Sequence, residues 1–325
     1  MSETADMLAA SAAQIFKRGG WDQIADAGLH RLLLPEDLGG AGDAYEDAVA
    51  VATQVGVHAL ATPLLETMAA NWCLAKAGLN VDDLPCGLVL PEGDFLNGRL
   101  FCTKPFTVPK DIGRAVIVLG SDIAVMDSFS NQTTASMSLD GIPARQFMPT
   151  TEGLDLAELA SLPAETPSPV LILALLKAAA MAGAMDAVLE LTVDYANTRK
   201  QFGRAIGQFQ AMQHMIAQLS GDVVAAAACV QHAARALQGP HGDWAVAAAK
   251  GFTSEAAGSV AAMAHQVHGA IGFTEDFVLQ RYTKCLWTWR EDAGSESAWY
   301  DLLGSAALRG GSAGLWPAIV EGASL

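Results

Sequence analysis

The stretch YANTRKQFGRAIGQFQAMQH, residues 195–214, joins two long predicted helical segments through a short cationic turn. It contains Arg199, Lys200 and Arg204, although the whole chain has only 19 lysines and arginines. An arginine beside the free backbone N–H groups of a helix end suits a pyrophosphate or a carboxylate. The same residues also fit a plain capping turn, in which the helix dipole stabilises the cations. Both interpretations stay open on these residues alone.

Long helices rich in alanine and leucine are predicted on both sides of this turn. We expect them over 170–198, 208–237 and 243–268, and short turns between long helices are typical of an up-and-down bundle. The longest apolar stretch lies near 170–189, but Lys177 and Asp186 interrupt it. A membrane span needs about 20 uninterrupted apolar residues, so this stretch predicts a buried helix.

The rest of the chain divides where its composition changes. Residues 1–84 have helical periodicity, broken at 34–42 by the stretch LPEDLGGAG, whose Pro and Gly residues favour a turn. Residues 85–167 contain short apolar runs separated by Gly, Pro, Asp and Asn, which predicts a small β domain. Residues 168–325 then form the helical bundle. The predicted fold is mainly α, with a small central β domain and a C-terminal up-and-down helical bundle.

Composition narrows the function classes. The chain has 325 residues, is 51% hydrophobic and carries a net charge of −16, so it can bury a core but is poorly suited to binding phosphate backbones or anionic lipid. We therefore expect neither a nucleic-acid nor a membrane partner. The five cysteines form no CxxC pair, and no acid or cysteine completes a metal set around His265 and His268. The acidic N-terminus is no signal peptide, and a cytoplasmic location is expected.

A second segment, HQVHGAIGFTED at 265–276, places two glycines three residues apart after a predicted helix. Backbone groups beside glycine can approach a flat ligand closely, although a helix cap would use the same residues. No strand precedes this segment and GxGxxG is absent, so it is not a dinucleotide fingerprint.

Three segments together resemble the acyl-CoA dehydrogenase family. RKQFG at 199–203, continued by Ile206, Phe209 and Gln210, is similar to the family's signature loop. QVHGAIGF at 266–273 resembles its second signature, and LPEDLGGAG is similar to its N-terminal segment. The resemblance implies an FAD flavoenzyme that oxidises acyl-CoA thioesters to 2-enoyl-CoA and passes electrons to an electron-transfer flavoprotein.

The resemblance also implies a set of cofactor-binding residues. In the family, the two signatures contact the pyrophosphate and adenosine of FAD, often across a subunit interface. A Gly-Thr-Ser-Glu-like stretch follows further on, and Gly294-Ser295-Glu296-Ser297 takes that place here. The residues implied are Arg199, Gln201, Phe202, Gly203, Gln210, Gln266, Val267, His268, Gly269, Ala270, Ser295 and Ser297.

Two departures from the family concern the flavin ring and the catalytic base. The middle-domain segment that flanks flavin and substrate is not found, and LPEGD at 90–94 is a poor match. The base must be a carboxylate of raised pKa, but the family's two positions for it fall on Ala293 and near Leu173. Glu291 is the candidate base if the loop is displaced.

Short family members without a base are one half of heteromeric acyl-CoA dehydrogenases, several of which act on CoA esters of steroid side chains or other bulky acids. The resemblance therefore implies a subunit that completes the FAD site of a longer catalytic partner. Two alternatives are a self-sufficient homo-oligomeric dehydrogenase with a relocated base and a non-catalytic structural paralogue.

Overall fold

The computed structural model describes residues 3–18, 20–127, 129, 133–239 and 241–321, and the chain forms two compact units. The first unit contains Met1–Ala13, Tyr45–Leu60 and Ala174–Leu325, and the second contains Gln14–Ala44 and Ala61–Leu173. Because both units are discontinuous along the chain, the division into 1–84, 85–167 and 168–325 stays a prediction.

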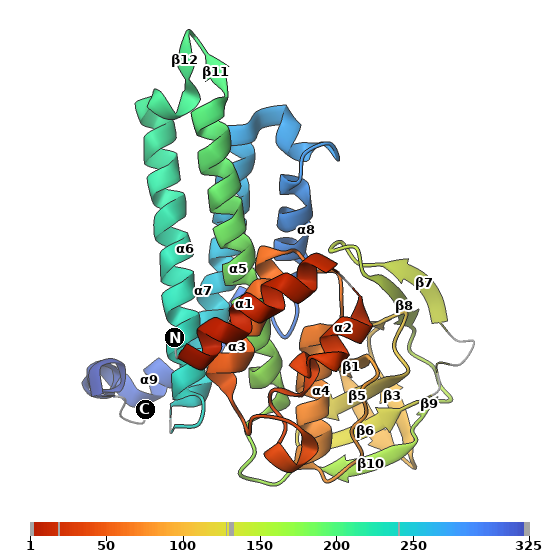
Figure 1. Cartoon of the computed structure of the whole chain (residues 1–325). Helices are drawn as coiled ribbons and strands as arrows, with labels where there is room; N and C mark the ends of the chain where they lie inside the picture. Colours follow the sequence, from red (N-terminus) through yellow and green to blue (C-terminus); the bar gives the residue numbers. More distant parts are fainter. Residues whose placement is uncertain (1–2, 19, 128, 130–132, 240, 322–325) are drawn as a thin grey trace. The chain divides into compact units, whose positions relative to one another are not determined.

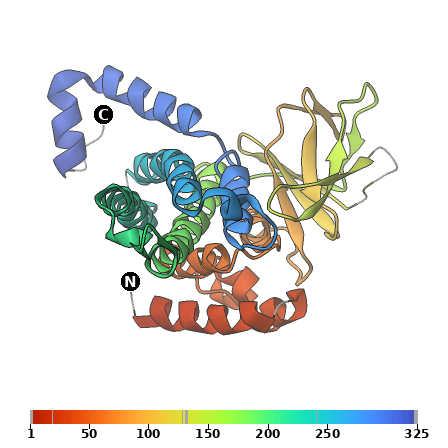
Figure 2. The ribbon, with the colours of Figure 1, turned by 90° about the horizontal axis from the view of Figure 1, so that it is seen from above.

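Three long helices dominate the first unit. They are α5 (Pro169–Thr198), α6 (Gln210–Ala236) and α7 (Gly242–His268), within one or two residues of the predicted bounds. They stand side by side and are seen nearly end-on in Figure 2. The helix α5 is long and apolar enough to cross a membrane, but 83% of its most apolar window is buried inside the protein. The prediction of a buried helix and a helical bundle is therefore confirmed.

The described residues also form further α-helices. They are α1 (Glu3–Arg18), α2 (Trp21–Asp26), α3 (Tyr45–Val57), α4 (Leu64–Lys76), α8 (Leu279–Trp289) and α9 (Glu296–Glu321). Two glycines bring α3 and α5 into backbone contact. A Cβ on Gly183 would lie 2.0 Å from the Thr53 carbonyl oxygen, and one on Gly56 would lie 1.9 Å from that of Ala180. No larger side chain fits at either position, so these two glycines set how closely α3 and α5 pack.

Among the described residues, the second unit contains the ten strands between Cys86 and Ser161, all within the predicted β region, and the first unit contains only a short two-stranded hairpin. One sheet has the order β1 (Cys86–Val89), β5 (Arg114–Leu119), β6 (Asp122–Met126) and β10 (Glu158–Ser161). Another has the order β2 (Gly93–Leu96), β3 (Arg99–Cys102) and β9 (Leu154–Asp155), and a third has β4 (Phe106–Pro109), β8 (Pro143–Phe147) and β7 (Thr133–Met137). Their inward residues, among them Leu100, Ile117 and Phe147, form one apolar core. The fold class predicted from the sequence is confirmed.

Candidate functional site

A β-hairpin connects α5 to α6 at one end of the bundle (Figure 1). Its strands, β11 (Lys200–Gln201) and β12 (Arg204–Ala205), are joined by Phe202 and Gly203, whose φ angles are 51° and 81°. Positive φ at both residues gives the tight hairpin turn that matches strand twist. The Phe202 side chain is 91% exposed at the tip. The motif predicted from the sequence is therefore more than a capping turn.

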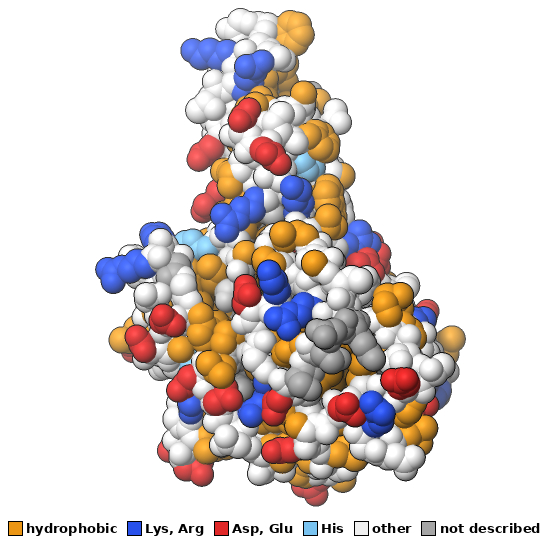
Figure 3. Space-filling view, turned by 90° about the vertical axis from the view of Figure 1, so that its right-hand side faces the viewer, with side chains coloured by type: hydrophobic (Ala, Val, Ile, Leu, Met, Phe, Trp, Pro, Cys, Tyr) orange, Lys and Arg blue, Asp and Glu red, His pale blue; other side chains and the backbone are white. Residues whose placement is uncertain are grey.

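Aromatic contacts support the hairpin from the start of α6. The guanidinium of Arg204 lies 4.1 Å from the centroid of the Phe209 ring, a cation–π contact. The Phe202 ring stands nearly perpendicular to that of Phe209, with 6.2 Å between centroids. Blue cationic side chains beside an orange apolar one mark this end in Figure 3. The hairpin is therefore a projection with cationic side chains and an apolar tip.

The C-terminal end of α7 packs against α5 beside the hairpin. The ring of His268 stacks on that of Tyr195 with 4.5 Å between centroids. His268 Nδ1 lies 2.8 Å from the Ala264 carbonyl oxygen, to which it donates as Nδ1–H, and burial lowers the pKa of this histidine. Gly269 then turns the chain with φ of 64° into η4 (Gly269–Phe273). The stacked pair joins two sequence motifs about 70 positions apart.

A pocket of about 540 Å³ opens between these two motifs. Its lining consists of Tyr195, Arg199, Gln201, Ile206, Gln266, Val267, His268, Gly269, Ala270 and Ile271. Seven of the twelve predicted cofactor residues are among them. One guanidinium and two amide side chains offer N–H donors to a ligand here, and the aromatic and aliphatic residues offer flat apolar surface. Such a donor set suits an anion attached to a planar group.

The other five predicted residues lie elsewhere. Phe202 and Gly203 form the hairpin tip, and Gln210 is exposed at the start of α6. Ser295 and Ser297 follow Gly294, whose carbonyl oxygen lies 2.9 Å from Lys250 Nζ. Lys250 precedes Gln266 by 16 positions on α7, which is about 24 Å along the helix axis. Within one chain the two serines are therefore remote from the pocket.

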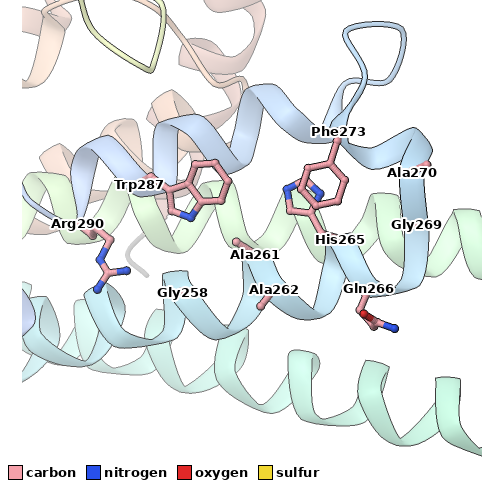
Figure 4. A pocket seen from close by; sticks show the side chains of 10 residues that line it. All are labelled: Gly258, Ala261, Ala262, His265, Gln266, Gly269, Ala270, Phe273, Trp287 and Arg290. Atoms are coloured by element: carbon pink, nitrogen blue, oxygen red, sulfur yellow. The ribbon is translucent and has the colours of Figure 1, made fainter.

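A second pocket, of about 630 Å³, lies along α7 and α8 (Figure 4). Gly258, Ala261 and Ala262 recur at helical spacing on α7, and this pattern of small residues is the sequence signal for the pocket. His265 stacks on Phe273 with 4.1 Å between ring centroids, and Trp287 faces them from α8. Within the described chain this pocket has no acidic residue in its lining.

The candidate base, Glu291, follows α8 in an unfavourable setting. Its side chain is 63% exposed and its Oε1 lies 3.4 Å from Arg290 Nε. A general base for an α-proton is expected in a site that excludes water, whereas Glu291 faces solvent and pairs with an arginine. The family's other position, near Leu173, is a buried leucine in α5. Glu291 as base stays a prediction that its surroundings do not support.

Comparison with known proteins agrees with this geometry. Residues 174–294 match the family model for the acyl-CoA dehydrogenase C-terminal domain. Acyl-CoA dehydrogenase IpdE2 of Mycobacterium tuberculosis is 34% identical over 260 residues, covering 79% of this chain and 76% of that protein. This chain belongs to the acyl-CoA dehydrogenase family. The IpdE2 protein of Mycolicibacterium smegmatis is also 34% identical, over 262 residues, covering 79% of this chain and 77% of that protein.

Solved structures share the whole fold of this acyl-CoA dehydrogenase family member. A chain of the ChsE4-ChsE5 complex from Mycobacterium tuberculosis superposes with a TM-score of 0.81 at 21% identity, covering 94% of this chain and 97% of that one. The Tcur3481-Tcur3483 steroid ACAD variant gives 0.78, also at 21% identity, with coverages of 93% and 97%. At this identity the likeness shows the fold.

FAD is the cofactor of this family, and an FAD-dependent dehydrogenase shares the fold with a TM-score of 0.77 at 18% identity, covering 94% of this chain and 98% of that one. The hydrogen-bond donors around the first pocket fit the nucleotide end of FAD. The Arg199 guanidinium and the Gln201 and Gln266 amides suit a pyrophosphate, and the apolar wall suits an adenosine. When bound, FAD supplies the hydride acceptor. This chain's pocket residues would bind and orient the nucleotide end.

Proposed function

We propose that this chain is the catalytically incomplete subunit of a heteromeric acyl-CoA dehydrogenase. The complex introduces an α,β double bond into an acyl-CoA thioester, of a bulky or steroid-derived acid, and passes electrons to an electron-transfer flavoprotein. This chain completes the FAD site of a longer partner with its pocket between α5 and α7. A cytoplasmic location is part of the proposal.

One observation carries the proposal. A pocket with nucleotide-suited donors is present, while the two positions of the family's base hold Ala293 and a buried apolar leucine. Glu291, the candidate base two residues before Ala293, is exposed and paired with arginine. Cofactor binding and proton removal are thus separable in this chain. Similarity to a chain of a two-protein complex and to a steroid acyl-CoA dehydrogenase favours an unlike pair.

Co-expression tests the proposal. This chain is produced alone and together with a longer, base-containing family member, and each product is analysed by flavin absorbance and native mass. We expect a stable unlike pair with about one FAD for each pair, as a shared site requires. The pair should oxidise an acyl-CoA, whereas this chain alone should not.

Two results would contradict it. A flavin-loaded oligomer of this chain alone that oxidises acyl-CoA would make it a self-sufficient dehydrogenase. A stable pair without flavin in any preparation would make it a structural paralogue.

A further inference from the structure

Two lysines are buried inside the helical unit and face the segment between α8 and α9. Lys250 on α7 is fully buried, and Lys177 on α5 is 3% exposed. Burying an ammonium group is costly unless oxygens around it replace water. The partners of these lysines therefore indicate what the burial achieves.

Lys250 binds both ends of one short segment, residues 290–294, which we call the α8–α9 connection. Its Nζ donates to the carbonyl oxygens of Arg290 and Gly294 and to Ser254 Oγ, each over 2.9 Å. Ser254 Oγ also donates to the Arg290 carbonyl oxygen over 3.3 Å. An ammonium has three N–H donors, so this group satisfies every one of them within the protein.

Lys177 binds the middle of the same connection. Its Nζ lies 2.7 Å from Asp292 Oδ2. Two helices, α5 and α7, thus attach to one five-residue segment at three points. These attachments are buried or partly buried, where hydrogen bonds to charged groups are stronger than at the surface.

The α8–α9 connection needs such support, because its backbone is strained. Ala293 has φ of 57° and Gly294 has φ of 102°, both in the left-handed region. Alanine in that region is disfavoured and persists only where the surroundings enforce it. Trp299 Nε1 donates to the Ala293 carbonyl oxygen over 3.1 Å, which adds one further restraint.

The charges around Lys250 also make the attachment sensitive to pH. Burial lowers the pKa of Lys250 to about 8, and Lys177 lowers it as well, while Asp292, Glu291 and Glu296 raise it. Arg290 faces the same region and pairs with Glu296 and Glu291. A neutral amine has two N–H donors for three oxygen acceptors, so one acceptor loses its partner when Lys250 deprotonates.

We propose that Lys250 and Lys177 are positioning residues that hold the α8–α9 connection, and through it Ser295 and Ser297, in the shape required by the shared cofactor site. The two serines follow directly on the strained turn, with their Oγ atoms 3.3 Å apart. The inference has two halves. The cofactor half, that the held connection shapes the FAD site, rests on the proposed function. The structural half, that the two lysines hold the α8–α9 connection, rests on the contacts within this chain.

Hydrogen exchange on the chain alone tests the structural half. The amides of Asp292, Gly294 and Trp299 are hydrogen-bonded to the Thr288, Glu291 and Ser295 carbonyls, so their exchange reports the connection. In Lys250→Met we expect these amides to exchange about tenfold faster, the effect of losing roughly one charged hydrogen bond. Lys284→Met, which removes a partly exposed cation from α8, is the matched control and should change nothing.

The pH dependence separates positioning from mere filling of space. After correction for intrinsic chemistry, exchange at these amides in the unsubstituted chain should change between pH 7 and pH 9, where Lys250 loses its proton. Lys250→Met should show no such change. If Lys250→Met does not fold, Ser254→Ala and Asp292→Asn each remove one partner and should give the same change at smaller size. Unchanged exchange in folded variants, or a pH profile equal to that of the unsubstituted chain, overturns the positioning role.

The cofactor half is tested in the co-expressed pair. FAD should dissociate about tenfold faster from a pair containing Lys250→Met than from the unsubstituted pair, with Lys284→Met as control. Faster exchange with unchanged FAD release overturns the link to the cofactor. An unsubstituted pair that holds no FAD contradicts the proposed function instead, and exchange still decides the structural half.

Discussion

Two cations packed along the helical unit, Arg199 after α5 and Lys250 within α7, use positive charge in opposite ways. At the Gln266 end of α7, Arg199 is exposed on the wall of a pocket, where its donors face a space that a ligand can fill. Lys250, which lies 16 positions before Gln266 on α7, is fully buried and donates all three of its N–H groups to oxygens of the protein itself. A cation whose hydrogen bonds are already satisfied stabilises the fold, whereas one that lines a pocket is available for recognition. Burial and partners, not residue type, separate the two roles.

Reversing the charge at the pocket end should have the largest effect. Arg199→Glu removes a charge-assisted donor and adds repulsion toward a pyrophosphate, so FAD binding by the unlike pair should weaken by about 3–4 kcal/mol. Titration with FAD, followed by flavin fluorescence, measures this. Arg235→Glu serves as the control. It changes an exposed arginine at the far end of α6, which pairs with Glu46 of α3. Equal FAD affinity of the two variants would show that Arg199 does not contribute to the cofactor site.

At Lys250, the effect of a substitution on stability should depend on pH. The pKa of Lys250 in the folded chain, about 8, lies below its ordinary value of 10.5, so the unfolded chain binds this proton more tightly. Folding stability therefore rises as pH increases from 8 to 10.5, and is lost again as pH falls through 8. Relative to Lys250→Met, the unsubstituted chain should gain roughly 3 kcal/mol over that interval.

Urea denaturation of both chains at several pH values measures this difference. Other groups that titrate in this range are shared by both chains and cancel in the comparison. Parallel stability curves would mean that Lys250 is not the group whose proton is released.

Breaking the second attachment should cost less. Lys177→Met leaves Asp292 without its cation, but Asp292 is 36% exposed and water can screen it. We expect a loss of about 1–2 kcal/mol in the free energy of unfolding, below the value for a fully buried pair. Lys104→Met breaks an exposed pair with Glu92 and should cost less than about 0.5 kcal/mol. Equal losses would show that burial of Lys177 adds nothing.

The smallest effect is expected at the candidate base. Glu291→Gln in the unlike pair should leave the acyl-CoA oxidation rate within about twofold, because an exposed carboxylate beside an arginine is a poor general base. The rate at saturating substrate and the flavin content check this together. Loss of activity in a folded, flavin-loaded variant would instead support a self-sufficient dehydrogenase with Glu291 as base.

The sequence predicts the fold better than it predicts the site. Helical periodicity and turn residues locate α5, α6 and α7 because long amphipathic patterns depend on local spacing. Motif residues such as Arg199 and Gln266 converge as expected, since both lie at helix ends that a bundle brings together. Lys177 and Lys250 could not be recognised, because a lysine in an alanine-rich helix looks the same whether it is solvated or bonded inside. The separation of Ser295 from the pocket likewise depends on tertiary structure.

If the chain works in the unlike pair proposed above, Phe202 at the hairpin tip has a consequence for the supply of the two subunits. Its backbone already has the left-handed conformation, and its side chain is 91% exposed in the single chain. The conformational cost of this turn is therefore met during folding, and a partner that covered the ring would need no rearrangement of the backbone at the tip. A copy made in excess of its partner, however, displays a bare aromatic ring to every other protein. We expect balanced synthesis of the two subunits to matter for the solubility of this one.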